Sequence, residues 1–193
     1  KACFACAMCC GKYSHTETKD YDVFVEGPEY ETVYAYGGQT GVDDLDSIIA
    51  ADRLSDEFGL DTLSAGVTIG FAMELYERGI LTPKDTGGME LIFGNHNAMV
   101  KLLQMMTYRE GLGGLLADGV KAAAEKIGGD SGKYVLHVKG LELPGYDPRG
   151  SWGMALAYVT APRGGCHMSA YPIEAEAWGD LDPFTFEGKA QLV

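Results

Sequence analysis

Residues 44–78 read DLDSIIAADRLSDEFGLDTLSAGVTIGFAMELYER, and this stretch decides the class of the fold. Apolar side chains recur at near-helical spacing over 44–58, and Gly59 follows as a stop signal. A second apolar series, spaced by four, covers 62–78. The sequence therefore predicts two consecutive helices joined by a short junction.

Two glycines, Gly66 and Gly70, lie inside the second expected helix. Each costs about 1 kcal/mol relative to alanine in a helix interior. Their presence predicts that another segment packs very closely against this helix.

The rest of the chain predicts a mainly α, multihelical fold with a few short β-strands. Apolar stripes favour helices over 97–108, with Asn97 as the N-cap, and over 115–127. Runs of aromatic and β-branched residues favour short strands over 21–26 and 30–36.

A polar, glycine-rich run at 128–133 is the expected linker between two domains. The first, residues 1–133, would be a helical domain that contains the clustered cysteines. The second, residues 134–193, would be the start of a C-terminal helical domain.

Composition excludes several classes of protein. The chain has 193 residues and a formal net charge of −13, which repels phosphate backbones and anionic lipid surfaces, so we expect no nucleic acid and no membrane as partner. No apolar stretch approaches the roughly 18 residues of a membrane-spanning helix, and the N-terminus lacks a signal-peptide pattern. We expect a cytoplasmic protein.

Three cysteines at C-x2-C-x3-C spacing, Cys3, Cys6 and Cys10, place three thiolates on one short loop. Soft sulfur ligands suit an iron–sulfur cluster or zinc. Remote candidates to complete a zinc site are the adjacent Cys166 and His167. The pattern favours a cluster, with zinc and free or oxidised thiols as alternatives.

The segment DEFGLD, residues 56–61, spans the expected junction between the two helices. Asp56 and Asp61 frame the backbone of Gly59 and Leu60, and carboxylates accept paired N–H bonds well. This arrangement suits an amino-substituted heterocycle such as a pterin. The alternative is purely structural: a helix stop followed by an aspartate N-cap.

Two further segments carry acid–base groups. EGPEYE, residues 26–31, has three carboxylates near a turn, and RGGCH, residues 163–167, combines a cation, a thiol and an imidazole. Taken singly, each is also explained as a solvated or structural loop.

Taken in order along the chain, these motifs resemble the aldehyde ferredoxin oxidoreductase family of tungsten-pterin enzymes. The resembling segments are CFAC (3–6) with Cys10-Gly11, GPEYE (27–31), DEFGLD (56–61), KGLELP (139–144), YDPRG (146–150) and RGGCH (163–167). The resemblance implies two largely helical domains behind an N-terminal sheet domain, and a tungsten or molybdenum bis-pterin beside a [4Fe-4S] cluster.

The resemblance also implies a role for individual residues. The ligands of the [4Fe-4S] cluster would be Cys3, Cys6 and Cys10. The residues that hold a pterin would be Asp56, Gly59, Leu60 and Asp61. The proton-transfer groups near the metal would be His167 and Glu31, the latter preferred over Glu29.

The sequence departs from the family in several places. A fourth cluster cysteine belongs to a second Asp-x-x-Gly-Leu-Cys motif, expected after Val193, and the N-terminal sheet domain is missing. Ala7 stands where relatives often have proline, and Cys9 is an additional thiol. We therefore expect this fragment alone not to hold the complete cofactor set.

The implied activity is oxidation of an aldehyde to a carboxylic acid, with electrons passed through the cluster to ferredoxin. The expected partners are ferredoxin, a small aldehyde and the remaining domains of the parent chain, with room for a homo-oligomer. One alternative is a relative that uses the same cofactor, such as a benzoyl-CoA reductase catalytic subunit. Another is a non-catalytic iron–sulfur electron-transfer module.

Overall fold

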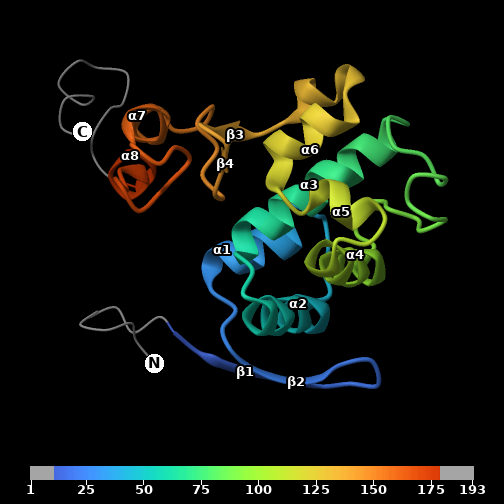
Figure 1. The fold of residues 1–193 in the computed structure, drawn as a ribbon. Coiled ribbons are helices and arrows are strands. Elements are labelled where there is room, and N and C mark those ends of the chain that lie inside the picture. The colour runs from blue at the N-terminus through green and yellow to red at the C-terminus, as the bar shows by residue number, and fades with distance from the viewer. Residues whose placement is uncertain (1–10, 179–193) are drawn as a thin grey trace. The chain divides into compact units, whose positions relative to one another are not determined.

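The structure, a computed structural model, describes residues 11–178. Helices dominate it and the strands are short (Figure 1), which confirms the predicted mainly α, multihelical class. The chain divides into two compact units, 1–135 and 136–193. That these units correspond to two domains of the parent protein stays a prediction.

The first unit begins with a β-hairpin and continues as a series of helices. Its elements are β1 (Tyr13–Glu17), β2 (Asp22–Glu26), α1 (Tyr30–Val33), the π-helix η1 (Tyr34–Gly38), α2 (Leu45–Phe58), α3 (Thr62–Glu77), α4 (His96–Tyr108), α5 (Leu112–Leu116), α6 (Gly119–Ile127) and the 3-10 helix η2 (Gly129–Tyr134). The second unit contains β3 (His137–Val138), β4 (Leu141–Glu142), α7 (Trp152–Thr160) and α8 (Ile173–Trp178). No helix among the described residues is long and apolar enough to cross a membrane.

Both predicted helices of 44–78 form, and local side chains set their ends. The Asp44 carboxylate accepts a hydrogen bond from the Ser47 N–H at the start of α2. Gly59 ends α2 with a φ of +67°, a left-handed conformation that glycine adopts at low cost. Asp61 then caps α3 through the Ser64 N–H.

Helix α3 is the centre of the core of the first unit, and its two glycines are the sites of closest approach. A Cβ on Gly66 would lie 2.5 Å from the carbonyl carbon of Ala35, and one on Gly70 would lie 2.9 Å from the Gln39 oxygen. The segment that packs closely against α3 is therefore η1 and its end, which confirms the prediction drawn from the glycines.

The prediction of a strand over 30–36 was wrong, because this segment is helical throughout. Its buried residues, Thr32, Ala35 and Tyr36, recur at helical spacing. The fully buried Tyr36 hydroxyl lies 2.7 Å from the Ser55 Oγ of α2. Strand β2 instead pairs with β1, which the sequence analysis did not predict.

Two helix boundaries also differ from the predictions. Helix α4 is capped by Asn95, whose side chain accepts the Ala98 N–H, and not by Asn97. The expected helix over 115–127 is divided into α5 and α6. It breaks before Gly119, which has a φ of +85° and cannot continue a right-handed helix.

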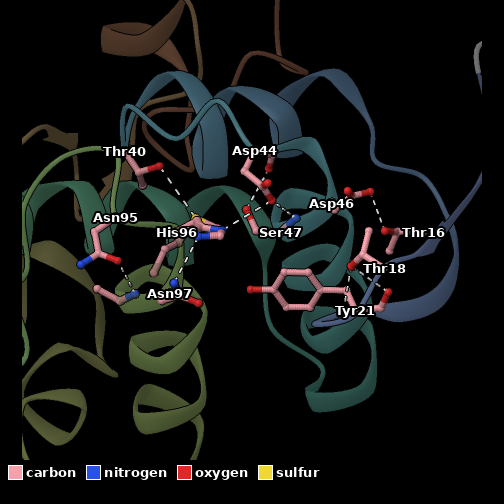
Figure 2. Close-up of polar contacts among 12 residues, drawn as sticks. Thr16, Thr18, Tyr21, Thr40, Asp44, Asp46, Ser47, Asn95, His96 and Asn97 are labelled. Atoms are coloured by element: carbon pink, nitrogen blue, oxygen red, sulfur yellow. Dashed lines mark hydrogen bonds and ion pairs between the residues drawn. The ribbon is translucent and has the colours of Figure 1, made fainter.

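Polar contacts at the start of α2 attach the hairpin and α4 to that helix (Figure 2). The Thr16 hydroxyl of β1 donates to the Asp46 carboxylate at 2.5 Å. On the α4 side, His96 Nδ1 lies 3.5 Å from Asp44 Oδ1. The Ser47 N–H and, less strongly, His96 hold the pKa of Asp44 below its usual value.

The glycine contact predicts the effect of a single methyl group. Gly66→Ala should lower the free energy of unfolding by about 1–3 kcal/mol, because overpacking against Ala35 outweighs the better helix propensity of alanine. Chemical denaturation measures the change. Gly132→Ala is the control, since no atom lies within 4 Å of the added methyl group; equal losses in both variants would contradict the packing argument.

Candidate functional site

The α2–α3 junction and the first turn of α1 meet in the first unit. The Thr32 hydroxyl of α1 lies 2.8 Å from the Thr62 hydroxyl at the start of α3. Glu31 precedes the first threonine and Asp61 precedes the second, so this contact brings the two predicted site segments together.

At the junction, the backbone N–H groups serve the helix end. The Gly59 N–H donates to the Asp56 carbonyl at 3.3 Å, and the Leu60 N–H donates to the Ser55 carbonyl at 2.9 Å. Together with the Asp61 cap on α3, this is the structural arrangement that the sequence analysis held as the alternative. Any ligand at the junction must therefore be bound by side chains and not by these backbone N–H groups.

The carboxylates of the junction keep free acceptor positions. The Asp56 side chain is exposed and its carboxylate accepts no hydrogen bond from residues 11–178, while Asp61 commits one carboxylate oxygen to the Ser64 N–H. Apart from Gly59 and its immediate chain neighbours, no atom of the described residues lies within 4 Å of the position that a Gly59 Cβ would take, so the space beside it is open. A pterin presents amino and ring N–H donors, and this set of acceptors fits such a group. The cap and a binding role are therefore compatible.

The structure places the two glutamates of the turn differently. Glu31 lies in the first turn of α1, is half-buried, and has one buried carboxylate oxygen, Oε1. Glu29 is the N-cap residue of α1 and is exposed. A role for Glu31 in proton transfer stays a prediction.

A buried carboxyl group that no sequence motif indicated, Asp52, lies in the middle of α2. The residue is only 5% exposed, and its Oδ2 has no hydrogen-bond partner among residues 11–178. Burial, and then the nearby Asp56 and Glu29, raise the pKa of Asp52 to about 6, while Lys12 acts in the opposite direction. A signal existed in the sequence: Asp52 follows Ile48 by four residues, on the apolar face of the helix.

In the second unit, His167 lies among tyrosines. Its ring centroid is 5.8 Å from that of Tyr146 and 6.4 Å from that of Tyr171. The two tyrosine hydroxyls lie 2.7 Å apart. Neither tyrosine was singled out as a site residue from the sequence, because the contacts join residues 25 positions apart.

Cys166, beside His167, is buried and free. Burial acts to raise the pKa of its thiol, but hydrogen bonds from Ser169 and from the backbone of Met168 lower it further than burial raises it. This cysteine belongs to the loop that carries the histidine, and within the described range it is not part of a group of three or more side chains that could hold a metal ion.

The predicted cluster ligands, Cys3, Cys6 and Cys10, lie outside the described residues. Between residues 11 and 178, no group of three or more His, Cys, Asp or Glu side chains is placed to hold a metal ion. Glu31 and the α2–α3 junction belong to the first unit and His167 to the second, so the structure brings Glu31 to the junction and describes His167 separately.

The buried carboxyl predicts a pH-dependent stability. A pKa raised from 3.8 to about 6 means that neutral Asp52 stabilises the fold below pH 4, and that this stability is lost as the pH rises through 6. Asp52→Asn should therefore gain about 2 kcal/mol over wild type between pH 4 and pH 7.5. Urea unfolding at both pH values measures this.

Glu57→Gln is the control for that measurement, because it removes an exposed carboxylate of the same helix that pairs only with Arg53. It should follow the wild type at both pH values. A wild-type stability that falls no more steeply than that of Asp52→Asn would refute the assignment of a raised pKa.

A family model and similar curated relatives point to the same protein family. The profile of "Aldehyde ferredoxin oxidoreductase, domains 2 & 3" matches residues 1–193. The tungsten-containing aldehyde ferredoxin oxidoreductase of Pyrococcus horikoshii is 43% identical over 189 residues, which cover 95% of this chain and 30% of that protein. The WOR-like subunit of an aliphatic sulfonate oxidoreductase from Pyrococcus furiosus is 35% identical over 186 residues, 92% of this chain and 30% of the relative.

A solved structure shows the same fold. The active-site complex BamBC of benzoyl coenzyme A reductase, bound to 1,5-dienoyl-CoA, matches with a TM-score of 0.65 and 29% identity over 84% of this chain and 24% of that one. The chain spans about 30% of the length of the curated relatives it matches. The sequence profile and these relatives together place the chain in the aldehyde ferredoxin oxidoreductase family, a family of oxidoreductases.

Proposed function

We propose that this chain forms the cofactor-binding part of a tungsten or molybdenum bis-pterin oxidoreductase that oxidises aldehydes to carboxylic acids. The single observation that carries the proposal is the α2–α3 junction, where Asp56 and Asp61 offer unused carboxylate oxygens beside an open Gly59. Membership of the family gives these acceptors their expected ligand, a pterin.

Each residue of the junction has a distinct task. Asp56 and Asp61 accept hydrogen bonds from the amino and ring N–H groups of the pterin, and Gly59 lets the ring approach the backbone. The Leu60 N–H donates to the Ser55 carbonyl at the end of α2, so Leu60 would contact the pterin through its other atoms. When bound, the metal-pterin supplies the two-electron redox chemistry.

Two residues of the chain would move protons. Oxidation of an aldehyde with water gives a carboxylic acid, two protons and two electrons, so groups that accept protons are needed. Glu31 would accept one through its carboxylate, positioned by the Thr32–Thr62 contact. His167 would accept or donate another at its imidazole, which the neighbouring tyrosine rings orient.

Electrons would leave through a [4Fe-4S] cluster to ferredoxin. Thiolates at Cys3, Cys6 and Cys10 would bind the cluster, with a fourth ligand supplied from outside this chain. The remaining parts of the protein, a small aldehyde and a second copy of the protein are the further partners proposed, in the cytoplasm.

A second candidate function has support from one of the comparisons. The similarity to a benzoyl coenzyme A reductase complex favours reduction of an aryl-CoA ester with the same type of cofactor. A shared cofactor site does not identify a substrate. Assays of the complete protein with acetaldehyde and with benzoyl-CoA distinguish the two, and a non-catalytic electron-transfer module would react with neither and contain no pterin.

Conservative changes at the junction separate binding from folding. Asp56→Asn and Asp61→Asn should each lower the pterin recovered per protein at least several-fold, whereas thermal stability should change little, because asparagine caps helices about as well as aspartate. Pterin fluorescence after oxidation, together with metal analysis, gives the readout.

Glu57→Gln, which neutralises the neighbouring exposed carboxylate, serves as the matched control and should keep the wild-type pterin content. Full pterin content in both aspartate variants would remove the junction from the binding site.

The histidine makes a separate prediction. His167→Asn should lower kcat for aldehyde oxidation by about 100-fold or more, in the range of lost general acid–base catalysis. The absorption of the iron–sulfur cluster should stay intact, because the substitution removes none of the proposed cysteine ligands. Steady-state kinetics and the visible spectrum test this, and an unchanged kcat would exclude His167 from proton transfer.

A further inference from the structure

We propose that Asp52 is a positioning residue for Glu31: its neutral carboxyl group holds the Gly27–Glu29 backbone against α2, and its ionisation loosens that segment. The inference rests on the proposed function only in the role given to Glu31. It concerns a side chain that the motifs did not include.

Asp52 of α2 packs against Gly27, which lies between β2 and α1. Any Cβ on Gly27 would overlap Asp52 Oδ2, so the carboxyl group lies directly on the glycine backbone. On its other side, Gly27 is held by the hairpin: its N–H donates to the Lys12 carbonyl at 3.0 Å, and its carbonyl accepts the Ser14 hydroxyl at 2.5 Å. Asp52 therefore closes the α2 side of a backbone position that is otherwise fixed.

From Gly27 the chain leads directly into the first turn of α1, which carries Glu31. The buried Pro28 follows, then Glu29, whose carbonyl accepts the Val33 N–H at 3.0 Å in the first turn of α1. Glu31 lies within this turn. A shift at Gly27 is thus passed to Glu31 through four residues of chain.

The charges around Asp52 explain why the neutral form is the one that holds the turn. Two carboxylates face it, Asp56 from its own helix and Glu29 from the turn before α1, and one cation faces it, Lys12 from the segment before β1. Tyr36 of η1 faces it as well, and Asp52 contributes to the raised pKa of that buried phenol. An ionised Asp52 meets net repulsion, and within the described part of the chain no hydrogen bond to Oδ2 compensates for it.

The burial of Asp52 also decides whether it acts on a substrate directly or through other residues. With a side chain only 5% exposed, Asp52 does not reach a substrate, and its effect must pass through the residues it touches. The control of Glu31 by Asp52 is therefore indirect, through the position of the turn.

Hydrogen exchange of backbone amides tests the proposal on the complete protein. After correction for intrinsic rates, protection of the Gly27 and Val33 amides in the wild type should fall by about threefold or more between pH 5 and pH 7.5, as Asp52 ionises and the turn loosens. In Asp52→Asn, which keeps the shape and cannot ionise, protection should be the same at both pH values. Glu57→Gln should behave as the wild type.

Equal amide protection at pH 5 and pH 7.5 in the wild type would overturn the proposal. This test uses the wild type alone and does not require any variant to fold. A pH dependence in Asp52→Asn equal to that of the wild type, or its loss in Glu57→Gln, would overturn it as well. Aldehyde oxidation with benzyl viologen as acceptor supplies the second readout: the change in kcat between pH 5 and pH 7.5 should be smaller in Asp52→Asn than in the wild type, because the variant keeps only the titration of the proton-transfer groups themselves. Absent aldehyde activity would count against the proposed function alone, since amide exchange reports the turn without turnover.

Discussion

The close approach of η1 to α3 is the contact on which the first unit depends. Two glycines on one face of α3 let a neighbouring backbone come nearer than any side chain would allow. Since Gly66 meets Ala35 in η1, the short helix α1 that precedes η1 is drawn to the start of α3, where Thr32 meets Thr62. The position of Glu31 beside the α2–α3 junction thus follows from a contact made by groups that carry no chemistry of their own.

The junction itself shows how one short segment serves both folding and binding. Gly59 and the backbone N–H groups end α2, and one oxygen of Asp61 starts α3. The bond from the Ser64 N–H fixes the direction in which Asp61 presents its second oxygen. A site built from helix ends in this way needs little further ordering when a ligand binds, which lowers the entropic cost of binding.

Burying a carboxyl group without a hydrogen-bond partner for one of its oxygens lowers the stability of the fold, because the group loses its hydration. Asp52 lies between the hairpin and α1, against the backbone of Gly27 and near the carboxylates of Asp56 and Glu29. An apolar residue of similar size would fill the same space without a desolvation penalty. Because the group there is ionisable, the packing of the backbone at Gly27 depends on the charges of the neighbouring carboxylates, Asp56 and Glu29.

The sequence by itself determined the features that depend on neighbours within a few residues. The spacing of apolar residues identified α2 and α3, Gly59 and Asp61 marked their ends, and the order of short motifs identified the family. Only the tertiary structure decided that 30–36 is helical and that Asp52 is buried against the Gly27 backbone, because both depend on contacts with distant segments. Tyr36 reaches Ser55 across 19 positions, and Asp52 meets a glycine 25 positions earlier; local propensity carries no information about such contacts.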